Sequence, residues 1–192
     1  MITSVYTMSG ARPLLIQPIH PFINLVFFQL VWIVTVLGVN LNRALPGLAI
    51  LCFFFIVHAV ISATVRVDMI LAAIAVTMGL VIDTFFIRVG LLSFDMNLPW
   101  PGIAPFWILI LWVNFALILN SGLRWLQGRY KIAAILGFIG GPLSYLGGLK
   151  LGAGELHVAP LTAFVIIGLC WAFVTPLLLM VARELTRRTM QS

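Results

Sequence analysis

The chain alternates between long apolar runs and short polar breaks, a pattern that predicts helices crossing a membrane. Each run stays apolar for about 20 residues, the length of a helix that crosses ~30 Å of hydrocarbon. Strands of a transmembrane barrel would be about 10 residues long and would alternate in polarity. We therefore predict an all-α, polytopic integral membrane protein with one six-transmembrane-helix bundle as its single domain. The predicted spans are residues 22–39, 46–65, 67–92, 105–123, 131–150 and 159–182.

Prolines and a short N-terminal stretch mark the limits of this bundle. Pro21 and Pro105 stand at the predicted starts of the first and fourth helices, and "NLPWPG" at 97–102 breaks the chain after the third. Residues 1–21 mix polar and apolar types around three prolines, so we expect a flexible or interfacial segment. A cleaved signal peptide is not predicted, because the charged region before the first span holds only Arg12.

Composition excludes the soluble globular class. Of the 192 residues, 62% are hydrophobic and 8% charged, and the mean hydropathy is +1.17, far from soluble usage. A net charge of +6 would suggest nucleic-acid binding in a soluble protein. In a membrane protein the basic residues are orientation signals, so no nucleic-acid partner is expected. Cys52 and Cys170 lie in apolar runs without neighbouring ligand-type residues, and neither a metal site nor a disulfide is predicted.

The basic residues predict the orientation of the bundle. With six spans, Arg43 and Lys150 fall on one side and Arg88 falls within a span. By the positive-inside rule, the richer side is cytoplasmic and carries both termini. Aromatic belts are expected, with Trp100 and Trp107 at the outer interface and Trp125 and Tyr130 at the inner one. The eight basic residues of the richer side are Arg12, Arg66, Arg124, Arg129, Lys131, Arg183, Arg187 and Arg188.

Asp83 is an acid deep inside the third predicted span. It lies about three residues, or roughly 5 Å, beyond the middle of that helix, and its short side chain cannot reach water. Arg88, five residues later, points roughly 140° away and can extend to the outer headgroups. Asp83 therefore needs a proton, a water molecule or a partner on another helix. Such a residue indicates either a functional site or an aspartate that fixes helix packing.

Depth in the membrane ranks the possible partners of Asp83. Tyr145 on the fifth helix is the best match, Asn114 and Gln29 lie near the middle, and His58 lies somewhat inward. Near the cytoplasmic end lie Asn24, Asn120 and Ser121. Together these side chains would form a polar column through the bundle. Hydrogen bonds between helices compete with ligand contact as the role of each amide. His58 alone predicts no metal site.

The fifth predicted helix is rich in small residues. Glycine or serine recurs every four positions from Gly140 to Gly152, with Gly137 and Gly141 on an adjoining stripe, so we expect close contact with protein. Pro142 removes an amide donor and predicts a kink or interruption. Broken helices at mid-membrane are typical of transporter binding sites. The segment from Gly141 to Tyr145 is therefore a candidate ligand site, the alternative being a kinked packing helix.

Four stretches resemble the signature segments of a family of small bacterial inner-membrane proteins known as a domain of unknown function. They are "NLVFFQLVW" (24–32), "GLVIDTFF" (79–86), "ILWVNFALILN" (110–120) and "GFIGGPLSYLGGLKLGA" (137–153). The resemblance covers about residues 22–182 and implies location in the bacterial inner membrane. Members are often encoded near enzymes similar to cyclopropane-fatty-acid synthases, which implies a role linked to lipid modification. The resemblance supplies no catalytic residue.

Three functions follow from these observations. The sequence has no nucleophile–base pair, paired carboxylates, metal-ligand spacing or phosphate loop, so a membrane lipid enzyme is the least favoured and no cofactor is expected. An accessory or scaffold protein that recruits a lipid-modifying enzyme fits the family setting. Its basic cytoplasmic loops would attract anionic headgroups. The alternative is a transporter of a small solute or lipid, using a polar site around Asp83 and a broken fifth helix.

Overall fold

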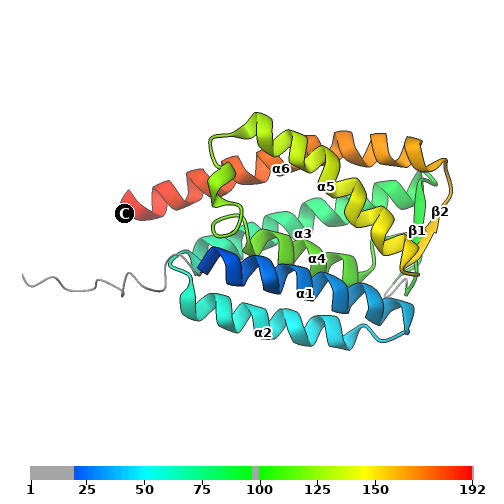
Figure 1. The fold of residues 1–192 in the computed structure, drawn as a ribbon, viewed down its shortest axis with the longest axis horizontal. Helices are drawn as coiled ribbons and strands as arrows, with labels where there is room; N and C mark the ends of the chain where they lie inside the picture. Colours follow the sequence, from blue (N-terminus) through cyan, green and yellow to red (C-terminus); the bar gives the residue numbers. More distant parts are fainter. Residues whose placement is uncertain (1–19, 97–99, 192) are drawn as a thin grey trace, which may run out of the picture.

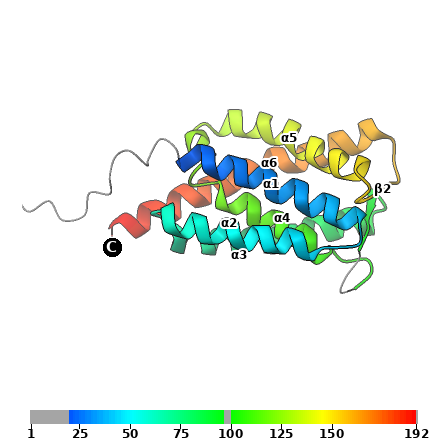
Figure 2. The ribbon, with the colours of Figure 1, turned by 60° about the horizontal axis from the view of Figure 1, so that its bottom comes forward.

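The computed structural model describes residues 20–96 and 100–191, which form six α-helices, two short β-strands and one 3-10 turn. Consecutive helices run in opposite directions along one long axis (Figures 1 and 2). A flexible or interfacial segment was predicted for residues 1–21, and its residues 1–19 lie outside the described part of the chain. The elements are α1 (His20–Asn40), α2 (Leu45–Ile61), α3 (Val65–Arg88), β1 (Leu92–Phe94), α4 (Phe106–Leu117), η1 (Arg124–Leu126), α5 (Tyr130–Lys150), β2 (Gly154–Leu156) and α6 (Pro160–Gln191).

Four of the described helices, α1, α3, α5 and α6, are long and apolar enough to cross a membrane. α2 and α4 are also apolar but have only 17 and 12 residues. At about 1.5 Å per residue, α2 is ~26 Å long and α4 only ~18 Å, against a hydrocarbon core of about 30 Å. The described part of the chain therefore has the helices of a membrane protein, four of them with the full length of a span.

α4 is shorter than predicted because the chain turns inside the bundle. The predicted fourth span ran to residue 123, but the helix ends at Leu117 and tight turns follow. Ser121 Oγ donates to the carbonyl of Leu117 (3.1 Å) and Gln127 Nε2 donates to that of Leu119 (3.2 Å). These side chains satisfy carbonyls that the ending helix leaves free. α4 packs against α1, α2 and α3, so its end is shielded by protein and hydropathy alone does not reveal it.

Two strands that the all-α prediction did not include form a small antiparallel sheet at one end of the bundle (Figure 1). β1 follows α3 and β2 follows α5, with Leu92 opposite Leu156 and Phe94 opposite Gly154. The third predicted span, 67–92, therefore ends early, at Arg88. A Cβ on Gly154 would collide with the carbonyl of Ser93, so only glycine permits this approach. Strands of three residues are too short to produce a readable alternation.

α5 is one continuous helix from Tyr130 to Lys150, with Pro142 inside it. The predicted interruption at Pro142 is therefore wrong. Proline at this position frees the carbonyl of Phe138, and that carbonyl lies against α6, 2.8 Å from where a Cβ on Gly168 would stand. Close packing on α6 holds the helix together across the proline, because tertiary contacts override local propensity.

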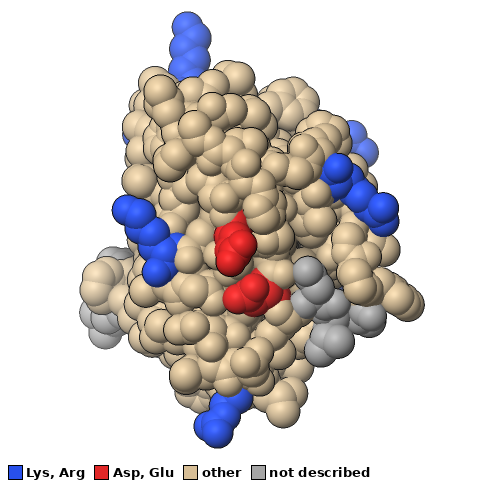
Figure 3. All heavy atoms as spheres, turned by 90° about the vertical axis from the view of Figure 1, so that its right-hand side faces the viewer, with Lys and Arg blue, Asp and Glu red and all other residues tan. Residues whose placement is uncertain are grey.

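The two ends of the bundle differ in charge. We call the end with β1 and β2 the sheet end and the opposite end the basic end. Asp95 and Glu155 are exposed beside the strands, and Figure 3, which views the sheet end, shows two adjacent acidic side chains with basic groups around them. Arg43, Arg88 and Lys150 belong to this end. The described basic residues of the basic end are Arg66, Arg124, Arg129, Lys131, Arg183, Arg187 and Arg188.

Near the ends of the bundle, Trp107 corrects one detail of the predictions, and Arg88 makes a contact that was not predicted. Trp107 is only 2% exposed, and its indole N–H donates to the carbonyl of Asp95 (2.9 Å), so it does not belong to a belt facing lipid. Trp100 and Trp125 are exposed, as a belt requires. Arg88, expected to reach the headgroups, donates from Nε to the carbonyl of Gly102 (2.8 Å). It remains exposed at the end of α3, so the hydrogen bond directs the side chain along the loop.

Candidate functional site

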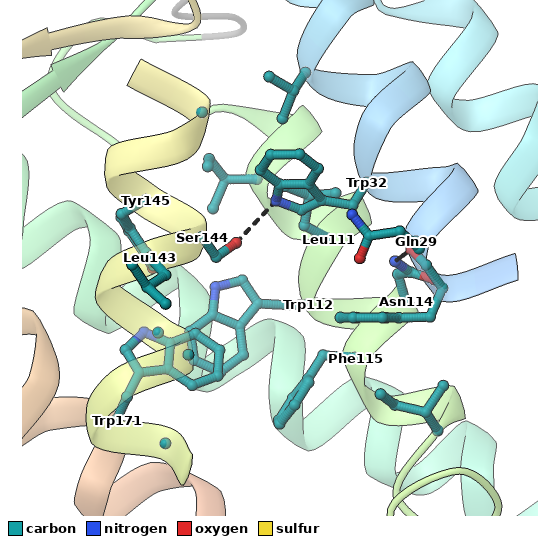
Figure 4. Close-up of a pocket in the computed structure, with 18 of the residues that line it drawn as sticks. Gln29, Trp32, Leu111, Trp112, Asn114, Phe115, Leu143, Ser144, Tyr145 and Trp171 are labelled. Carbon is teal, nitrogen blue, oxygen red and sulfur yellow. Dashed lines mark hydrogen bonds between the residues drawn. The ribbon is translucent and has the colours of Figure 1, made fainter. Parts of the chain in front are cut away.

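A cavity of about 470 Å³ lies inside the bundle between α1, α4, α5 and α6 (Figure 4). Its volume is within the usual range of small-molecule sites, about 300–1,000 Å³. Most of its wall is apolar, and four of the six tryptophans line it. An apolar wall with a few polar groups is typical of a ligand pocket. The four tryptophans are Trp32, Trp107, Trp112 and Trp171.

The cavity has a side opening between α1 and α5, which we call the mouth. The two helices approach each other toward the sheet end, where Trp32 Nε1 donates to Ser144 Oγ (2.8 Å). Nearer the basic end, no atom apart from Gly140, its chain neighbours and the adjacent backbone of α5 lies within 4 Å of the position of a Cβ on Gly140. Leu25 of α1 and Leu143 of α5 both line the cavity and are 39% and 59% exposed. The mouth therefore opens on the side of the bundle, where these helices would face lipid.

Asp83 lies behind the cavity wall. It is fully buried, and residues four apart on the same face of α3 (Leu71, Ala75, Gly79) are buried too. Its Oδ1 accepts a hydrogen bond from the Tyr145 hydroxyl (2.6 Å), and its Oδ2 accepts one from Trp112 Nε1 (2.7 Å). Tyr145 and Trp112 line the cavity, whereas Asp83 does not. Asp83 therefore positions two wall residues from α4 and α5.

Glycine allows this arrangement on α3. Gly79, one turn before Asp83, lies against the Trp112 indole, and a Cβ there would overlap the ring. Trp112 in turn stacks on Trp171 of α6, with ring centroids 5.0 Å apart and planes at 19°. The Tyr145 ring meets Trp171 edge to face at 6.3 Å. The Asp83 carboxyl group thus holds an aromatic wall that joins α4, α5 and α6.

Three buried polar atoms on the cavity wall have no hydrogen-bond partner among the described residues. They are Asn114 Oδ1, Trp171 Nε1 and Thr175 Oγ1. The other end of the Asn114 amide is held, because Nδ2 donates to the carbonyl of Phe28 (2.9 Å). Gln29 is exposed at the mouth. The cavity therefore offers hydrogen-bonding groups within an apolar wall.

A second polar cluster lies near the basic end, away from the cavity. Asp68, in the first turn of α3, is fully buried and Oδ2 contacts His58 Nε2 (2.8 Å). Ser62 and Thr64, which follow the end of α2, also donate to Oδ2 (3.2 and 2.9 Å). Asn120 donates to Oδ1 (2.8 Å). These contacts join α2, α3 and the turn after α4, and they explain why α2 ends at Ile61 rather than at the predicted residue 65.

A profile of one sequence family, described as a protein of unknown function (DUF2878), matches residues 21–177. The chain belongs to the DUF2878 family. No curated protein and no solved structure matches it. The matched stretch runs from α1 into α6 and contains all the described residues that line the cavity, from Leu25 to Thr175. The predicted resemblance to a family of unknown function is confirmed over nearly the expected range.

The DUF2878 structure brings some of the predicted site residues together and separates others. The predicted contact between Asp83 and Tyr145 is present. Asn114 and Gln29 meet at the cavity instead, and His58 belongs to the Asp68 cluster. Asp83 and Asp68 are 15 residues apart on α3, about 22 Å, so His58 lies at a different depth from Asp83 and contacts another acid; the polar column stays a prediction.

The fifth helix also differs from its predicted role. The stripe that packs closely on α6 is Gly137 and Gly141, each against Trp171. Gly140 and Ser144, from the stripe with four-residue spacing, line the cavity. Gly141 and Pro142 are buried, and Gly141 lines the cavity whereas Pro142 does not. The cavity therefore lies on the face with the four-residue spacing, and the close packing that this spacing predicted is on the adjoining stripe instead.

Sequence reasoning did not identify Asp68 or Trp112. Asp68 had a signal, since it is a second acid in the third apolar run. Trp112 had none, because an apolar run gives no indication of which ring meets an acid on another helix. Within the described residues, no three His, Cys, Asp or Glu side chains gather as a metal site needs.

Proposed function

We propose that this DUF2878 protein binds a lipid from the surrounding bilayer in the cavity between α1 and α5, as a lipid-handling protein linked to membrane lipid modification. The observation that carries this proposal is the side mouth at Gly140, which leads into an apolar cavity. A ligand dissolved in lipid would enter through it without passing through water. A water-soluble cargo would instead favour an opening at one end of the bundle.

The proposal includes six membrane crossings with both termini in the cytoplasm of a bacterial inner membrane. Consecutive helices alternate in direction (Figure 1), so the basic end would carry both termini. That end has seven described basic residues against three at the sheet end, which fits the positive-inside rule. α4 need not match the hydrocarbon thickness, because it packs against α1, α2 and α3.

Quenching of tryptophan fluorescence by brominated lipid chains tests this function, because quenching requires close contact. We would replace exposed Trp100 and Trp125 by phenylalanine, so that the four cavity tryptophans give the signal. The protein would be placed in nanodiscs of phosphatidylcholine with brominated or plain acyl chains. Brominated chains are expected to quench a large part of the emission.

A matched pair of variants locates the quenching. Gly140→Phe fills the open space at the mouth, and Ile139→Phe places the same ring on the adjacent, exposed residue, which does not line the cavity. We expect quenching to fall by about half or more in Gly140→Phe, because a phenylalanine ring occupies much of the mouth. Ile139→Phe should leave it unchanged. Equal quenching in both variants would contradict lipid entry at the mouth.

An accessory role remains a second proposal, supported by the charge at the basic end. Arg66, Arg124 and Arg129 are exposed there, and such groups attract anionic headgroups or an acidic partner surface. A lipid-modifying enzyme that meets this end would be placed next to the lipid held by the cavity. Purification in a mild detergent should then recover such an enzyme with the chain, and its loss after Arg124→Glu and Arg129→Glu would locate the contact.

A further inference from the structure

We infer that the cavity selects an uncharged lipid that carries a hydroxyl group, in preference to a pure hydrocarbon chain or a charged headgroup. This inference rests on the proposed function, because it specifies the ligand of the same cavity. It depends on three properties of the cavity wall: the absence of charge, unpartnered polar atoms, and the depth of those atoms.

The first property is the absence of charge on the described part of the wall. None of the described residues that line the cavity is Asp, Glu, Lys, Arg or His. Asp83 is behind the wall, and both of its oxygens already accept hydrogen bonds, from Tyr145 and Trp112. A charged headgroup would find no counter-charge in a medium of low dielectric constant, which is strongly unfavourable. The wall therefore favours a neutral ligand.

The second property is an acceptor that needs a donor. Asn114 Nδ2 donates to a backbone carbonyl, which fixes the amide so that Oδ1 is the free acceptor. Thr175 Oγ1, a hydroxyl that can donate or accept, and Trp171 Nε1, which can only donate, are also without a partner among the described residues. A pure hydrocarbon would leave all three groups unsatisfied in an apolar site. A ligand hydroxyl can donate to Asn114 Oδ1 or accept from Thr175 or Trp171.

The third property is the depth of these groups. Thr175 contacts Gly137, three residues from the middle of α5, and Asn114 donates to the carbonyl of Phe28, two residues from the middle of α1. The polar groups are thus far from both ends of the bundle, where the headgroups of ordinary phospholipids lie. A small neutral group such as a hydroxyl can enter the hydrocarbon region at lower cost than an ionic one. The expected class is therefore a long-chain, isoprenoid or ring alcohol.

Three probes with one chain and different heads test this inference. They are hexadecane, 1-hexadecanol and hexadecyl sulfate, each added to nanodiscs that contain brominated lipid. Binding in the cavity displaces the brominated chain and restores tryptophan emission. We expect 1-hexadecanol to act at a concentration about three to ten times lower than hexadecane, the usual contribution of one or two hydrogen bonds. Hexadecyl sulfate should be the weakest.

Variants at Thr175 connect this preference to the wall. Thr175→Val is close in shape and removes a hydroxyl that has no partner among the described residues, so the fold should persist. It should reduce the preference for the alcohol over the alkane, and Thr175→Ser should retain it. Thr77→Val is the control, because Thr77 is on α3, outside the cavity, and its hydroxyl donates to the carbonyl of Ala73.

The outcomes separate this inference from the proposed function. Equal action of all three probes, or the strongest action by hexadecyl sulfate, would overturn the inference while brominated lipid still quenches. An alcohol preference that Thr175→Val leaves intact would also overturn the assignment to this wall. Absence of quenching by brominated lipid in the unaltered protein would instead contradict the proposed function itself.

Discussion

At the scale of single residues, Asp83 shows how a buried acid acts in this bundle. Each carboxylate oxygen accepts a hydrogen bond, one from Tyr145 and one from Trp112, and the acid is fully buried behind the cavity wall. The sequence predicted a partner for Asp83 from depth alone, and that prediction is confirmed for Tyr145. Its role is to position two residues of the cavity wall.

Replacing Asp83 tests this positioning role. Asp83→Leu leaves the Tyr145 hydroxyl and the Trp112 indole N–H buried without an acceptor. Each unpaired donor costs about 1–3 kcal/mol, so we expect a loss of about 2–6 kcal/mol of stability. Asp83→Asn should lose less, because its amide oxygen still accepts one of the two bonds. Thermal unfolding in detergent measures the difference, and an unchanged melting temperature for Asp83→Leu would contradict the role.

The Asp68 cluster makes a similar prediction at the other end of α3. Asp68→Ala removes the acceptor for Ser62, Thr64 and Asn120 as well as the contact with His58. Ser62→Ala removes a single, long bond (3.2 Å). We expect Asp68→Ala to cost several kcal/mol and Ser62→Ala about 1 kcal/mol or less. Thermal unfolding would show the order, and similar losses for both would exclude Asp68 as the centre of the cluster.

At the scale of elements, the contact between α5 and α6 depends on which glycines face it. Gly137 and Gly141 lie against Trp171, and the carbonyl of Phe138 lies against Gly168. Close approach of two backbones is the usual role of small residues in membrane helices. Here that contact also supports α5 across Pro142, which explains why a helix with an internal proline is continuous.

Two neighbouring glycines of α5 give a matched prediction for this contact. A Cβ on Gly141 would overlap the Trp171 ring, whereas a Cβ on Gly140 would meet no atom within 4 Å. Gly141→Ala should destabilise the protein by about 1–3 kcal/mol. Gly140→Ala should be neutral or stabilise it by up to about 1 kcal/mol, because alanine favours helix. Melting temperatures of the two variants check the order, and the reverse order would mean that α5 is rotated.

At the scale of the whole molecule, charge and helix direction support the proposed orientation. Seven described basic residues lie at one end, and the exposed acids Asp95 and Glu155 lie at the other (Figure 3). The small sheet joins the connection after α3 to the connection after α5. The sheet therefore connects two loops, one after α3 and one after α5, that would lie outside the membrane on the same side.

Cysteine labelling tests this orientation. In a background with Cys52 and Cys170 replaced, Glu155→Cys at the sheet end should react with an impermeant maleimide in intact cells. Arg129→Cys at the basic end should react only after the membrane is opened. Both positions are exposed in the structure, so burial within the protein does not prevent either cysteine from reacting. Labelling of both positions from outside would contradict six crossings.

The sequence by itself determined the class of the protein, the approximate place of each helix and the charge difference between its ends. These properties follow from local composition, because a lipid environment requires long apolar helices and basic residues resist transfer across the membrane. It also indicated the contact of Asp83 with Tyr145, since depth along antiparallel helices is readable from residue numbers.

Only the tertiary structure decided where the cavity lies and which polar groups face it. The end of α4, the continuity of α5 and the separation of His58 from Asp83 depend on how helices rotate and approach one another. Rotation is fixed by contacts between distant residues, such as Gly79 with Trp112 and Gly141 with Trp171. An apolar residue that faces lipid and one that lines a cavity have the same hydropathy, so the chain alone does not distinguish them.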